Sequence, residues 1–177
     1  QLVELLGTGV NVQLNGGITY TIQGSIANLH SAITNSRLTK ASGATINVAV
    51  QGAFIANAFA SDNDTMKLLA INESNKVAAN GISLDAAAKG STFEQTLSNL
   101  TDALDGITGL SGDIKIYSAA NTKENLGGSN IAAVNALKGK TTGEIVAKFT
   151  GVSVVGTNPI IGLTTGPGDA IDITIRK

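Results

Sequence analysis

The sequence predicts an α+β fold in which a mainly antiparallel β-sheet or sandwich of about nine strands is combined with two or three short helices. Two observations support this prediction. Branched aliphatic residues alternate with polar residues in several short runs, which is the period of a strand with one buried face. Glycine is abundant between these runs, where turns need its backbone freedom. A chain of 177 residues buries a core without disulfides or metals, so we expect a single β-rich domain over 1–177.

The first part of the chain predicts a hairpin, a helix and a strand. Apolar and aromatic residues alternate with others over 10–14 and again over 18–22. Asn15-Gly16-Gly17 between the two runs predicts the turn of a β-hairpin, because these residues adopt positive φ readily. The period becomes helical over roughly 25–37 and returns to that of a strand over 46–50.

The middle of the chain predicts two further strands and a well-capped helix. The apolar run 66–71 and the pair at 82–84 are expected to be strands. Ser91 and Glu94 have the spacing of a capping box, and the apolar positions that follow lie on one helical face. We therefore predict a helix over 92–105.

The last part of the chain is again rich in alternating runs, and no repeat of 20–50 residues is evident anywhere in the sequence. One helix is expected between the strands, starting at Asn130 and ending near residue 137. The expected strands are 114–117, 145–154 with a bulge at Gly151, 160–163 and 171–175.

The composition argues against catalysis. The chain has no Cys and a single His, His30, whose nearest acidic residue in the sequence is Glu4. Nucleophilic catalysis by Ser or Thr needs a His held by a carboxylate, and no Gly-x-Ser-x-Gly elbow surrounds any serine. Paired carboxylates could serve a glycosidase, but two Tyr and four Phe provide few rings on which sugars could stack. We expect no enzyme and no cofactor.

One acidic segment is a weak candidate for Ca²⁺. Asp62 and Asp64 could supply oxygen ligands, and Glu73 is the twelfth residue counted from Asp62. The EF-hand pattern fails because Met66 replaces an oxygen ligand and Lys67 stands where the loop needs glycine. A solvated turn is the alternative, and we predict no firm metal site.

Several partner classes are disfavoured by charge and hydropathy. The net charge is −1 and the basic residues are scattered, so no basic stripe is present to follow a nucleic-acid backbone. No apolar run reaches the 18 residues of a membrane span. The chain begins with Gln1 in place of Met, which favours removal of a signal peptide or propeptide and hence an extracellular or cell-surface location.

Small and β-branched residues, with Thr, Asn and Ser in place of charges, are suited to closely packed sheets that assemble. In this respect the composition resembles that of exported filament proteins such as pilins and the outer domains of flagellins. We therefore expect a structural subunit that binds copies of itself in a surface filament. Residues 1–14 are a candidate inter-subunit arm or donor strand. The alternatives are a virion protein of a tail tube, capsid or decoration, and a monomeric module that binds carbohydrates or surface glycans.

Overall fold

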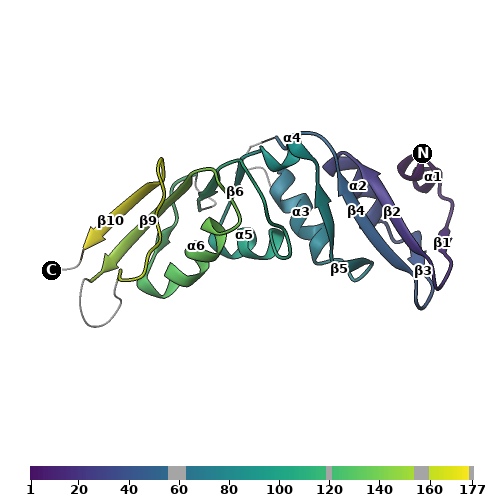
Figure 1. The fold of residues 1–177 in the computed structure, drawn as a ribbon. Coiled ribbons are helices and arrows are strands. Elements are labelled where there is room, and N and C mark those ends of the chain that lie inside the picture. The colour runs from purple at the N-terminus through teal and green to yellow at the C-terminus, as the bar shows by residue number, and fades with distance from the viewer. Residues whose placement is uncertain (56–62, 119–120, 154–159, 176–177) are drawn as a thin grey trace.

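The computed structural model describes residues 1–55, 63–118, 121–153 and 160–175, and it shows an α/β protein with mostly parallel strands in three small sheets (Figure 1). The predicted antiparallel sheet or sandwich is therefore wrong. Every strand ladder in the described residues is parallel, and the one antiparallel pairing is an isolated bridge between Tyr117 and Lys123.

The described residues form ten strands, six α-helices and a short 3-10 helix. The strands are β1 (Val12–Leu14), β2 (Thr19–Gly24), β3 (Leu38–Lys40), β4 (Thr45–Val50), β5 (Val77–Leu84), β6 (Phe93–Gln95), β7 (Ile114–Ile116), β8 (Asn125–Leu126), β9 (Ile145–Val152) and β10 (Ala170–Ile175). The helices are α1 (Leu2–Gly7), α2 (Ile26–Ile33), α3 (Asp64–Asn72), α4 (Ala86–Lys89), α5 (Leu97–Ala103), η1 (Gly128–Asn130) and α6 (Ile131–Lys138).

The strands are stacked almost in the order of the sequence. One sheet pairs β1 with β3, a second has the order β2-β4-β5, and a third has the order β10-β9-β7-β6 with β8 also on β9. The helices pack in the same succession, α1 on α2, α2 on α3, α3 on α5 and α5 on α6. The molecule is consequently elongated, with its two termini at opposite ends (Figure 1). This is the arrangement of a solenoid, in which each coil contacts its neighbours.

The predicted hairpin over 10–22 is wrong, although both of its strands exist. β1 pairs with β3 and β2 pairs with β4, each in parallel. The turn between β1 and β2 brings the chain from one sheet to another without pairing the two strands. Gly16 is needed in this turn because a side chain there would collide with the carbonyl of Ser42.

Two other elements differ in kind from the prediction. The run 66–71 belongs to helix α3, whose N-cap Asn63 accepts a hydrogen bond from the Met66 amide at 2.7 Å. The predicted helix over 92–105 divides into strand β6 and the shorter helix α5, which is capped by Thr96. Ser91 does not cap it, because its hydroxyl donates to the Ala87 carbonyl and accepts from the Phe54 amide.

Other elements follow the sequence closely. Helix α2 is capped by Ser25 and is shorter than predicted, and Asn130 directly precedes helix α6. The alternating runs 46–50, 114–117, 145–154 and 171–175 correspond to β4, β7, β9 and β10, with residue 154 outside the described residues. The run 160–163 is a turn, where the prediction had a strand.

The second and third sheets share no ladder, and side chains join them at what we call the sheet junction. The ring of Phe54 packs edge-on against that of Phe93, with centroids 5.2 Å apart. The Glu94 amide donates to the hydroxyl of Thr65 at 3.4 Å. The Asn72 amide donates to carbonyls at the end of α5. The junction is therefore built from core packing and side-chain hydrogen bonds.

Lysines from one coil cap the helix of an earlier coil. The Lys76 ammonium donates to the carbonyls of Ile33 and Asn35 after α2, at 2.8 and 2.6 Å. The Lys140 ammonium donates to those of Leu104 and Ile107 after α5, at 2.9 and 3.2 Å. These carbonyls lie at or just beyond the C-terminal ends of α2 and α5, where the helix dipole favours a cation. Those of Asn35 and Leu104 also accept from backbone amides in the turns that follow.

We expect Lys76→Met and Lys140→Met each to lower the free energy of unfolding by about 1–3 kcal/mol, because methionine keeps the apolar stem and removes two charged hydrogen bonds. Urea denaturation measures this loss. Lys40→Met, at an exposed position in β3, is the matched control and should leave stability unchanged. Equal effects of all three substitutions would show that capping is not the cause.

Candidate functional site

The predicted Ca²⁺ candidates are not brought together by the structure. Asp64 lies in the first turn of α3, where its carboxylate accepts from the Ile55 amide at 2.7 Å and from the Lys67 ammonium at 3.1 Å. Glu73 is the C-cap of the same helix, so about 13 Å of helix separates the two residues. Asp62 lies outside the described residues. Within the described ranges, no group of three or more His, Cys, Asp or Glu side chains is arranged to hold a metal ion.

An open acidic depression of about 580 Å³ lies between the ends of α3 and α5, lined by Asn72, Glu73, Thr101, Asp102 and Asp105. The Asn72 side-chain amide donates to the carbonyls of Asp102 and Asp105 at 2.8 and 3.2 Å. The backbone oxygens that a cation would use there already have a donor. The depression is therefore an acidic part of the surface beside the sheet junction.

One carboxyl at the sheet junction has a shifted pKa. Burial raises the pKa of Glu94, and the nearby charge of Lys115 opposes the shift. The two residues are register partners on β6 and β7. Because Glu94 faces a cation across the ladder, we assign it a cross-strand pairing role.

The C-terminal end of the stack exposes aliphatic side chains on the core side of a sheet. β10 pairs with β9 in a register that places Ile173 beside Phe149 and Ile175 beside Val152. Phe149 and Val152 are fully buried, yet Ile173 and Ile175 are 47% and 54% exposed. The difference arises because β10 is the last strand of its sheet, and no following coil in the described residues covers its isoleucines.

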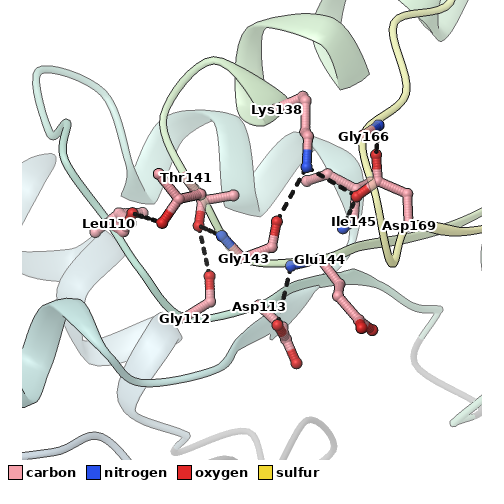
Figure 2. Close-up of polar contacts among 11 residues, drawn as sticks. Leu110, Gly112, Asp113, Lys138, Thr141, Gly143, Glu144, Ile145, Gly166 and Asp169 are labelled. Carbon is pink, nitrogen blue, oxygen red and sulfur yellow. Dashed lines mark hydrogen bonds and ion pairs between the residues drawn. The ribbon is translucent and has the colours of Figure 1, made fainter.

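A buried ion pair holds the chain in place just before β10 (Figure 2). The Asp169 carboxylate, on a side chain only 1% exposed, accepts from the Lys138 ammonium at 2.9 Å. It also accepts from the amides of Ile145 and Gly166 at 2.8 and 2.6 Å. The Lys138 ammonium donates in addition to the Gly143 carbonyl at 3.1 Å. β10 is thus an ordered edge strand, fixed to the start of β9 and the end of α6.

Two opposing effects set the pKa of Asp169. Burial alone would raise it, but the hydrogen bonds from Lys138, Ile145 and Gly166, with the charge of Lys138, together hold it below the usual carboxyl value. Asp169 is therefore ionised at neutral pH, and its ion pair with Lys138, which we call the Lys138–Asp169 lock, is formed.

The N-terminal end also presents apolar surface. Helix α1 buries Leu6 against the stack and turns Leu5 outward, where it is 44% exposed. A mainly apolar depression of about 440 Å³ runs beside it, lined by Gln1, Leu2, Glu4, Leu5 and Thr8. β2 is the terminal strand of the second sheet and pairs only with β4 among the described strands. Both ends of the elongated molecule thus combine a terminal strand with exposed aliphatic residues.

Comparisons with family models, with curated proteins and with solved structures found no match. None of the helices in the described part of the chain has the length and apolar character of a membrane span. The candidate site therefore rests on the geometry of the two ends. The alternation over 171–175 predicted the C-terminal strand. The Lys138–Asp169 lock left no sequence signal, because its partners are 31 residues apart in the chain.

Proposed function

We propose that this protein is a non-catalytic structural subunit whose copies join end to end in an extracellular filament. The observation that carries the proposal is the exposed row of isoleucines on the core side of β10. The ends of a solenoid are normally covered by capping coils with polar outer faces. On β10 no described residue covers Ile173 and Ile175, and an edge strand with exposed aliphatic residues is a surface suited to strand addition.

The direction of the strands favours a head-to-tail contact between copies. The ladders are parallel, and β10 and β2 are terminal strands of six residues at opposite ends of the stack. A head-to-tail contact would place β2 of a second copy beside β10 in the same parallel sense, next to α1, whose Leu2 and Val3 line a depression together with Ile22 of β2. The core side of β2 carries Tyr20 and Ile22, since these residues pair with the buried Ile46 and Val48. Such a contact joins two different surfaces and does not close on itself, so it generates a filament.

In this proposal the segment 1–14 belongs to the N-terminal end of the stack, which is one of the two contact surfaces. Residues 2–7 form α1 on α2, and β1 pairs with β3 of the same chain. Exchange of this segment between subunits stays a prediction, and it requires α1 to leave its place on α2. Since a helix of six residues is marginal on its own, the packing of Leu6 provides much of what holds it there.

The test is polymerisation of Ile173→Lys. We expect the wild-type protein to form filaments visible by electron microscopy, and Ile173→Lys to remain monomeric while keeping its circular dichroism spectrum. The lysine should block assembly because a charge on the core side of β10 would be desolvated by the incoming copy. Thr174→Lys is the matched control, since it places the same charge on the opposite face of the same strand and should assemble as the wild type does.

Other outcomes would support the alternatives. A wild-type protein that stays monomeric at every concentration overturns the filament proposal, and so does an Ile173→Lys variant that polymerises as the wild type does. Closed tubes or shells would favour a virion component. A monomer whose melting temperature rises with added glycans would favour an exported carbohydrate-binding module.

A further inference from the structure

Strand β5 leaves its ladder at one point. β4 pairs Ile46 with Val77 and then Val48 with Ile82, so residues 78–81 lie opposite the single residue Asn47 and bulge out of the sheet. Asn80 lies in this bulge with a φ of +55°, in the left-handed region that few residues other than Gly and Asn adopt readily. It is exposed to solvent.

The side chain of Asn80 contacts the far side of the sheet junction. Gly106, with a φ of +69°, follows the last turn of α5, and a side chain at this position would collide with the Asn80 amide oxygen. The bulge therefore lies against the backbone at the end of α5. The acidic depression lined by Asp105 and Asp102 is formed by the same turn.

We propose that Asn80 is a site of spontaneous deamidation and that its conversion loosens the sheet junction. The backbone nitrogen of Gly81 attacks Cγ of Asn80, the Cγ–Nδ2 bond breaks, and the Gly81 amide proton leaves with ammonia. The resulting succinimide ring is opened by water at one of its two carbonyls. The products are aspartate, with the original backbone, and isoaspartate, with one additional backbone atom.

Three features of the chain favour this reaction at Asn80. Gly81 has no Cβ, so its nitrogen is unhindered in the attack. The bulge lies outside the β4–β5 register, so ring closure there need not separate the paired strands. Exposure admits the water that opens the ring and releases the ammonia. Asparagine is a thermolabile residue in proteins for these chemical reasons.

Both products would weaken the sheet junction. The new carboxylate lies beside Gly106, just after the C-terminal end of α5, where the helix dipole disfavours negative charge. Isoaspartate also lengthens the bulge that contacts Gly106. We expect a decrease in melting temperature of about 1–4 °C in the converted protein.

The test is peptide mapping of the purified protein during incubation in warm, mildly alkaline buffer. We expect the peptide that contains Asn80 to gain about 1 Da, and the melting temperature to decrease as this mass increases. Asn80→Asp should reproduce the effect of the charge at time zero. Asn80→Gly, which suits the positive φ and has no side-chain amide, should show neither change.

The chain provides its own internal comparison in Asn15-Gly16, the other Asn-Gly pair. Conversion at Asn15 without any at Asn80 would overturn the assignment of the site. A full mass gain at Asn80 with no decrease in melting temperature would overturn its effect on the sheet junction. The decrease must be absent from Asn80→Gly, because a decrease there would come from Asn15.

Discussion

Replacement of Asp169 by alanine is expected to lower the free energy of unfolding by about 3–5 kcal/mol, the loss typical of a broken buried ion pair. The substitution removes three hydrogen bonds at once, those from Lys138, Ile145 and Gly166. It leaves the ammonium of Lys138 beside the Gly143 carbonyl without its counter-ion. The segment that leads into β10 is then no longer fixed to the start of β9.

The free energy of unfolding should depend on pH because of the same Lys138–Asp169 lock. The folded-state pKa of Asp169 is below its unfolded value. Its contribution is therefore fully present above about pH 4, the usual carboxyl range, and is lost as the pH falls through the lowered pKa. We expect Asp169→Asn to be less stable than the wild type at neutral pH and nearly equal to it in strong acid.

The matched control for this prediction is Asp172→Ala. Asp172 forms an ion pair with Lys123 at 2.9 Å, but its side chain is 60% exposed, and exposed pairs contribute about 0–1 kcal/mol. Urea denaturation of both variants measures the difference. Amide hydrogen exchange should show faster exchange in β10 of Asp169→Ala. Similar losses in the two variants would contradict the role assigned to the buried pair.

Replacement of Phe93 by alanine is expected to cost about 3–5 kcal/mol, as large-to-small changes at buried aromatic positions do. Phe93 is fully buried and its ring packs edge-on against Phe54 across the sheet junction. The substitution removes buried apolar area, opens a cavity and loses the ring contact. Because side chains join the two sheets at this junction, we also expect the two parts of the stack to unfold less cooperatively.

Thermal and urea unfolding, each followed by two probes, measure both effects. Tyr20 lies in the first part of the stack and Tyr117 in the second, so tyrosine fluorescence in single-tyrosine variants separates the transitions. Phe93→Leu, which keeps most of the apolar volume, is the control and should lose markedly less stability. Coincident transitions in Phe93→Ala would show that coupling does not depend on this ring.

The positions of the strands were largely predictable from sequence, and their partners were not. Alternation over 46–50, 145–154 and 171–175 reflects one buried face, which parallel and antiparallel strands share. Whether two strands run parallel depends on which strand pairs with which. That pairing depends on the length of each coil, and the coil lengths differ from one another. The structure repeats in its backbone pairing, while the sequence shows no repeat.

The errors in element type have local causes. The run 66–71 is too short for its period to separate strand from helix, and the cap at Asn63 decides the outcome. Ser91 has capping-box spacing, but its hydroxyl is bound to Ala87 and Phe54 in the tertiary structure. The lock at Asp169 depends on a lysine in a separate coil, so no local pattern could reveal it.

The stacking order of the strands bears on how the chain acquires its structure during synthesis. Almost every strand pairs with the one that precedes it in the same sheet, so the strand with which a new coil pairs has already been synthesised. Folding can therefore proceed vectorially from the ribosome, adding one coil at a time without waiting for a distant partner. The coil closed by Asp169 then forms after the coils that precede it, so the exposed isoleucines of β10 appear only once those coils are in place.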